Sequence, residues 1–157
     1  MKNFFRKVAF GIGPNEEVPS DPLSWALNQL NEIPELSWKG KIYSEKELRN
    51  YYKEWVYGDR KVLRKKYKDN KNLYKTHKDI LRHKTGQKFW ESLEISIRHN
   101  EGINSNFPVL AKLWMFWGNF FAISEKDFLA NYSTGPYHRE IIRPNLNQTF
   151  EKMVYDV

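Results

Sequence analysis

The stretch FPVLAKLWMFWGNFF, residues 107–121, decides what kind of fold this chain can form. Its large apolar side chains cover nearly every side of a helix, and Pro108 stands in the first turn, where proline is well tolerated. A helix that is apolar all round is buried on all sides or belongs to something larger. The stretch is too short to span a bilayer comfortably. We therefore expect a core helix here.

Sequence signals for the starts of further helices lie on both sides of this stretch. Asp21-Pro22 combines a capping residue with proline at the first helical position, and Ser44-x-x-Glu47 has the form of a capping box. Ser124-x-x-Asp127 resembles a weaker box, and a last helix is expected from about Asn147. Gly11-Ile12-Gly13-Pro14 lacks the third glycine of a dinucleotide loop, so it predicts a turn after a first helix within residues 2–10.

The segment from Arg60 to about His99 predicts one long helix or two helices that meet near Thr85-Gly86. A seam that packs on another helix is expected at residues spaced alternately by four and three, namely Leu63, Tyr67, Asn70, Tyr74, His77 and Leu81. We expect Gly58-Asp59 to break or bend the preceding helix, and a short helix to end before Gly135-Pro136.

These patterns together predict an all-α fold, because no stretch shows the alternation of a β-strand. The expected architecture is an irregular bundle in which a long basic helix or helix pair packs on the buried tryptophan-rich helix. With 157 residues, the chain forms a single helical domain over 1–157 or the N-terminal fragment of a larger helical domain.

The net charge of +7 is concentrated in one segment. Residues 39–88 hold 17 lysines and arginines against 6 acidic residues, whereas the remainder holds 9 against 13. One interpretation is a solvated helix face, and the other is a patch for nucleic acid or acidic lipid. Tyrosines interleave with the lysines, although their helical spacing also suits a core. The candidate nucleic-acid contacts are Arg60, Lys61, Arg64, Lys65, Lys66 and Lys68.

The sequence lacks the residues that several classes of function require. The chain has no cysteine, which excludes a disulfide scaffold, a thiol nucleophile and cysteine-ligated metals. The four histidines lack helical zinc spacing, and no serine lies in a nucleophile-elbow motif, so no cofactor or metal is predicted. No apolar run is long enough to cross a membrane and no secretion signal is visible, so we expect a cytoplasmic protein without a membrane span.

Four motifs, in order along the chain, resemble the bacterial domain of unknown function 1800 family. They are AFGIGP at residues 9–14, Asp21-Pro22-x-x-Trp25, LWMFWGNFFAIS at residues 113–124 and GPYHREIIRP at residues 135–144. The family's members are usually several times longer, largely helical and often exported, and they have no securely assigned activity. The resemblance therefore implies that this chain matches the N-terminal part of such a protein, as a truncated member.

Two positions depart from the family pattern. Phe120 and Asn145 stand where the family usually has histidines, so any chemistry of those histidines would be missing here. Other polar and aromatic residues of the two longer motifs are retained: Trp117, Asn119, Tyr137, Arg139, Glu140 and Arg143. An asparagine and an Arg–Glu pair of this kind commonly tie helices together.

Three hypotheses follow. The leading one is a helical fragment without catalysis of its own, which uses an exposed apolar face to bind the missing C-terminal part or a protein partner. The second is a hydrolase-like or metal-dependent enzyme that uses Asn119, His138, Arg139 and Glu140, with Arg143 as a further site candidate. The third is a nucleic-acid-binding module that uses the basic helix over residues 60–88.

Overall fold

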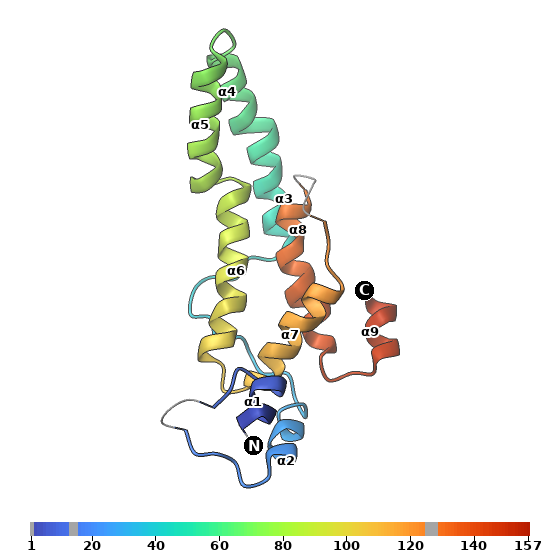
Figure 1. Ribbon diagram of the computed structural model, residues 1–157. Helices are drawn as coiled ribbons and strands as arrows, with labels where there is room; N and C mark the ends of the chain where they lie inside the picture. The colour runs from blue at the N-terminus through green and yellow to red at the C-terminus, as the bar shows by residue number, and fades with distance from the viewer. Residues whose placement is uncertain (1, 13–15, 125–128) are drawn as a thin grey trace. The chain divides into compact units, whose positions relative to one another are not determined.

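The computed structural model describes residues 2–12, 16–124 and 129–157, and Figure 1 shows its course. These ranges contain helices and connecting segments but no strand, which confirms the all-α fold class. The α-helices are α1 (Lys2–Val8), α2 (Pro22–Asn28), α3 (Glu45–Lys53), α4 (Arg60–Lys66), α5 (Lys71–Lys84), α6 (Gln87–Asn104), α7 (Pro108–Phe120), α8 (Ala130–Pro136) and α9 (Phe150–Asp156). The described ranges also contain the π-helices η1 (Glu54–Asp59) and η2 (Tyr137–Ile142) and the 3₁₀-helix η3 (Arg143–Asn145).

The chain divides into two compact units. Unit 1 comprises residues 1–40, 96–122 and 137–157, and unit 2 comprises residues 41–95 and 123–136. The expected packing of the basic helices on the tryptophan-rich helix involves both units and stays a prediction, as does the single-domain organisation. Within the described ranges, no helix is long and apolar enough to cross a membrane.

Unit 1 is built around the N-terminal part of α7. A buried cluster joins α7 to the first two helices through Ala9, Ala26 and Val109, with Phe4, Val8, Trp25, Leu30 and Leu113 packed against it. The Val109 amide donates to the Gln29 side chain over 3.0 Å, and Lys112 Nζ donates to the Arg6 and Ala9 carbonyls, the latter at 2.7 Å. Side chains thus satisfy one free amide at the start of α7 and two carbonyls at the end of α1.

Of the two alternatives for α7, burial on all sides is wrong. Leu110 and Trp114 are buried, but Phe116 and Phe120 are 56% and 61% exposed. The described part of unit 1 covers only one face of this helix. The exposed apolar face of α7 is consistent with the other alternative, in which the helix is part of a larger structure.

Unit 2 has its own aromatic core. Leu48, Trp55, Trp90 and Tyr132 form a buried cluster that draws on α3, η1, α6 and α8. The rings of Trp90, Tyr43 and Tyr51 contact one another. Their centroids are 4.8 Å apart for Trp90 and Tyr43, 4.6 Å for Trp90 and Tyr51, and 5.9 Å for the two tyrosines. Burial of these large rings stabilises unit 2.

The local start signals of two helices are confirmed. The Asp21 carboxylate accepts hydrogen bonds from the Leu23 and Ser24 amides at the start of α2. At α3 the Glu47 amide donates to Ser44 Oγ at 3.3 Å, and the Ser44 amide donates to Glu47 Oε2 at 2.9 Å. Each cap satisfies amides that the helix itself leaves free. The box at Ser124-x-x-Asp127 extends outside the described residues.

Residues 60–99 belong to three helices, α4, α5 and α6, and not to the one or two that were predicted. The predicted boundary at Thr85-Gly86 is confirmed, but a second turn separates α4 from α5. Asn70 caps α5 by accepting from the Leu73 amide at 3.0 Å, so it does not belong to a continuous seam. The rings of Tyr67 and His77 instead stack on each other, with their centroids 4.6 Å apart. Figure 1 shows the contacting helices α4 and α5 side by side.

Two predicted helix breaks are wrong, whereas the alternative of a bend at Gly58-Asp59 stays a prediction. The helix continues through Gly58-Asp59 as η1, and it continues through Gly135-Pro136 into η2. At Pro136 the missing amide removes one α-helical hydrogen bond, and π-helical geometry follows at once. Gly135 is required by close packing, because a Cβ at this position would lie 2.2 Å from the Glu94 side chain.

Candidate functional site

His138 is the most deeply buried of the four residues that the enzyme hypothesis requires. Its relative exposure is 4%, and a Cβ on Gly118 would lie 2.6 Å from its ring atoms Nδ1 and Cε1. The His138 carbonyl accepts from Trp114 Nε1 at 2.8 Å, whereas its Nδ1 has no hydrogen-bond partner in the described structure. His138 is therefore a packed group of the interior of unit 1.

The electrostatic environment keeps His138 neutral. Burial, and to a lesser extent the positive charge of Arg98, lowers the pKa of His138 to about 4. Protonation of His138 would place a positive charge in this buried environment, which costs free energy. The arrangement favours a structural role at neutral pH over that of a general base.

The other enzyme candidates differ from His138 in exposure and partners. Asn119 is exposed on α7, Arg139 is buried, and Glu140 is half exposed with Oε1 3.5 Å from Arg139 Nη1. None of these residues contributes to the groove or the cleft described below. In the described ranges, no three histidine or acidic side chains cluster as a metal site would require.

Arg143 forms a buried polar network in unit 1. Its Nη2 donates to the Pro34 carbonyl at 2.6 Å and lies 3.9 Å from Glu101 Oε2. Burial lowers the pKa of Arg143 while the Glu101 carboxylate opposes this shift. Glu101 is 3% exposed and accepts hydrogen bonds from both the amide and the hydroxyl of Ser37.

Glu101 was missed in the sequence, although one signal was present. It follows Leu93 and Ile97 at intervals of four residues, so it continues the apolar stripe of α6 and occupies a core-facing position. A carboxylate at such a position requires charged or hydrogen-bonding partners. Its partners Ser37 and Arg143 lie far away in the sequence and could not be paired with it beforehand.

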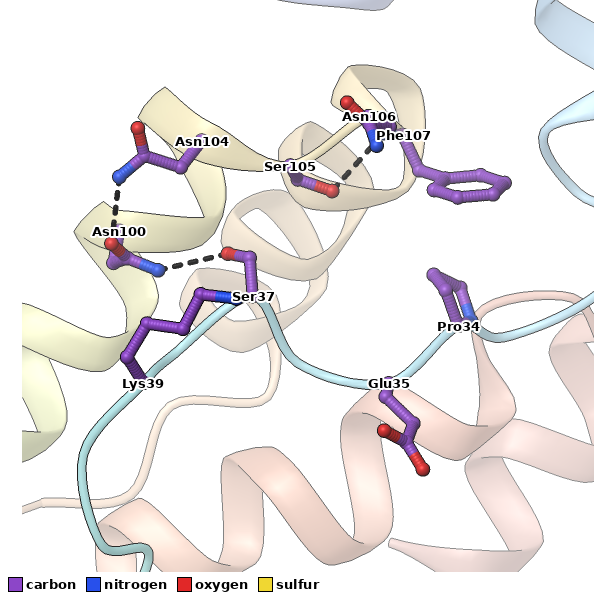
Figure 2. Close-up of a pocket in the computed structure, with 9 residues that line it drawn as sticks. All are labelled: Pro34, Glu35, Ser37, Lys39, Asn100, Asn104, Ser105, Asn106 and Phe107. Atoms are coloured by element: carbon purple, nitrogen blue, oxygen red, sulfur yellow. Dashed lines mark hydrogen bonds between the residues drawn. The ribbon is translucent and has the colours of Figure 1, made fainter.

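A groove of about 540 Å³ shares Ser37 with this network. Figure 2 shows the residues that line the groove. Asn104 Nδ2 donates to Asn100 Oδ1 at 2.7 Å, and Asn100 Nδ2 donates to Ser37 Oγ at 2.8 Å. The full lining is Pro34, Glu35, Ser37, Lys39, Asn100, Asn104, Ser105, Asn106 and Phe107. A relay from buried Glu101 thus orients amides and a hydroxyl that could hydrogen-bond a neutral ligand.

A second feature of unit 1 is an aromatic surface, defined here as Phe116, Trp117, Phe120, Phe121 and Phe150. Trp117 contacts each of the four phenylalanines, with centroid separations of 5.0 to 5.7 Å. Phe116, Phe120 and Phe150 are 56%, 61% and 53% exposed. The rings therefore form one connected apolar surface rather than scattered exposed residues.

Unit 2 carries a basic arm, defined here as residues 60–84 with helices α4 and α5. The arm has 11 lysines and arginines against 2 acidic residues. None of its residues is buried, and all of them are described. Of the nucleic-acid candidates, Arg60 is partly buried, whereas Lys61, Arg64, Lys65, Lys66 and Lys68 are exposed.

The net charge belongs to unit 2 alone. Counted over the sequence, unit 1 contains nine basic and nine acidic residues, whereas unit 2 contains 17 basic and 10 acidic residues. The aromatic surface and the basic arm therefore lie on different units with different electrostatic character.

No family model, curated protein or solved structure matches this chain. The resemblance to the domain of unknown function 1800 family accordingly stays a prediction that rests on its four motifs.

Proposed function

We propose that this chain is a binding protein without chemistry of its own, and that its aromatic surface docks an apolar helix of a protein partner. The single observation that carries this proposal is the connected set of five rings around Trp117, three of which are more than half exposed.

The composition of this surface suits protein recognition. Aromatic side chains are enriched at the centres of protein interfaces, because they bury a large area while losing few rotatable bonds. A connected patch is more informative than single exposed apolar residues, which are common on soluble proteins. The contact of Trp117 in α7 with Phe150 at the start of α9 means that the surface draws on two helices, and grooves of this kind can receive an apolar helix.

The proposed occupant is an apolar helix from a domain of the type that the sequence resembles. Because members of that family are expected to be longer, such a helix would come from the same polypeptide or from a separate chain. Phe120 supports this interpretation, since it places a 61% exposed apolar ring where the family usually has histidine. The alternative of a hydrolase-like or metal-dependent enzyme receives no comparable support from the positions of Asn119 and His138.

The proposal can be tested by sedimentation velocity combined with binding of a fluorescent dye that reports exposed apolar surface. Without its partner, the protein should bind the dye and self-associate with increasing concentration. The double variant Phe116→Ser/Phe120→Ser should lose most of both signals while it stays folded by circular dichroism.

Ile103→Ser provides the matched control. Ile103 lies in unit 1 and is 81% exposed, but it belongs to no ring contact of the aromatic surface. This variant should keep the dye binding and self-association of the parent protein. A parent protein that is a monomer at all concentrations and binds no dye would contradict the proposal.

A further inference from the structure

A cleft with an aromatic wall and a cationic rim lies where the basic arm begins. It has a volume of about 420 Å³ and is lined by Val56, Tyr57, Arg60, Lys61 and Arg64. Tyr57 is 69% exposed, so one face of its ring is accessible to a ligand. The volume is within the range typical of small-molecule and nucleotide sites.

The spacing of these residues explains how one continuous helical run builds the cleft. Tyr57, Arg60, Lys61 and Arg64 follow one another at intervals of three, one and three, which is the spacing of one helical face. Tyr57 lies in the π-helix η1, whereas the three cations lie in α4. Short π-helical segments within longer helices are frequent at functional sites.

The second helix of the arm fixes part of the cationic rim. Burial alone would raise the pKa of the Tyr74 phenol, but hydrogen bonding by Arg60 and Arg64 together with the charge of Lys78 lowers it overall. Arg60 and Arg64 of α4 thus interact with a side chain of α5. Such contacts reduce the entropy that the arginines would lose on binding a ligand.

We propose that the basic arm binds single-stranded nucleic acid, with a base stacked on Tyr57 and backbone phosphates on Arg60, Lys61 and Arg64. A cationic groove beside an exposed aromatic ring is the combination that sequence-independent single-strand binding uses. Charge complementarity supports this partner, because the arm has 11 basic residues and 2 acidic residues. The remaining exposed cations, including Lys65, Lys66 and Lys68, lie farther along the arm to contact further phosphates.

A single strand fits better than either a duplex or an acidic membrane. The bases of a duplex are already stacked on each other, so Tyr57 would gain no partner there. A lipid headgroup offers phosphate but no base, so it would leave the ring of Tyr57 without a function. The contribution of Tyr57 therefore distinguishes the three ligands.

The test uses fluorescence anisotropy of the whole chain with a labelled thymidine oligonucleotide of about 15 nucleotides, a length typical of single-strand sites. The logarithm of the association constant should fall against the logarithm of salt with a slope of about −2 or steeper, because each phosphate contact on a single strand contributes about −0.7. Arg64→Ala should make this slope shallower by about 0.7.

Substitutions of Tyr57 test the stacking. Tyr57→Ala should weaken binding about tenfold or more, while Tyr57→Phe should retain most of the affinity, because the ring and not the hydroxyl makes the contact. Tyr155→Ala is the matched control, since this tyrosine of unit 1 is 88% exposed but lies outside the arm. This control should bind as the parent protein does.

Three results would overturn the proposal. The first is the absence of binding at low salt. The second is a duplex of the same length that binds as tightly as the single strand, with Tyr57→Ala leaving both affinities unchanged. The third is tighter binding to phosphatidylserine vesicles than to the oligonucleotide, again without an effect of Tyr57→Ala, which would assign the arm to a membrane surface.

Discussion

The two units have similar interiors and different surfaces. Trp114 is fully buried in unit 1, and Trp55 and Trp90 are buried in unit 2, so each unit is stabilised by large aromatic side chains. Unit 1 has balanced charges and exposes an aromatic surface, whereas unit 2 holds the entire net charge and exposes a basic arm. Because both cores consist of large aromatic side chains, we infer that the two units differ in binding through their surfaces.

The largest expected effect contrasts the ion pairs of the two units. Glu101 is buried in unit 1 against Arg143 and Ser37, so Glu101→Gln should lower the free energy of unfolding by about 3 kcal/mol. The exposed pair of Glu45 and Arg49 in unit 2 has a shorter separation of 2.6 Å, yet Glu45→Gln should cost only about 0.5 kcal/mol. Chemical denaturation of both variants measures the difference, and equal losses would refute the contrast.

The second expected effect is a pH dependence from unit 1. His138 binds a proton below pH 6.5 when unfolded but only near pH 4 when folded, because burial lowers its pKa. The unfolded state thus binds more protons between these values, so stability should fall from pH 6.5 towards pH 4 by up to about 3 kcal/mol. His138→Gln should flatten this region of the stability profile, and a variant that keeps the full slope would contradict the assignment.

The third contrast compares two glycines. A Cβ on Gly118 would lie 2.6 Å from the buried His138 ring, so Gly118→Ala should destabilise unit 1 by roughly 1–3 kcal/mol. Gly58 in unit 2 has no atom within 4 Å of such a Cβ, and Gly58→Ala should stabilise by about 0.5 kcal/mol through helix propensity. Thermal unfolding should shift the two variants in opposite directions, and a shift in the same direction would count against the packing around His138.

The smallest expected effect concerns helix caps. Ser44 and Glu47 cap α3 reciprocally in unit 2, whereas Thr149 caps α9 in unit 1 with a single bond to the Lys152 amide at 3.2 Å. Ser44→Ala should cost about 1 kcal/mol and Thr149→Ala about 0.5 kcal/mol. Urea titrations that show a larger loss for Thr149→Ala would reverse this ranking.

Local signals predicted much of the fold. The Asp21-Pro22 and Ser44-x-x-Glu47 starts were predicted correctly because caps involve residues only two or three positions apart. The turn before Asn70 was missed because its residues continue the apolar spacing of the helices on both sides. The packing of Gly135 against the distant Glu94 was also missed, because no local pattern reveals this contact.

The candidate sites were predicted less well for the same reason. The charged residues of the basic arm were visible in the sequence, but the cleft at Tyr57 depends on the π-helix that replaces the expected break at Gly58-Asp59. In unit 1, the sequence directed attention to His138, whereas the polar network is centred on Glu101, whose partners Ser37 and Arg143 are distant along the chain.

The most direct test of separate binding surfaces measures two ligands on one variant, Phe116→Ser/Phe120→Ser. If the aromatic surface of unit 1 is the site of protein docking, this variant should lose dye binding and self-association while it binds the thymidine oligonucleotide with the affinity of the parent protein. Unchanged dye binding would contradict the proposed docking surface. A parallel loss of oligonucleotide binding in the folded variant would contradict the assignment of the two activities to different units.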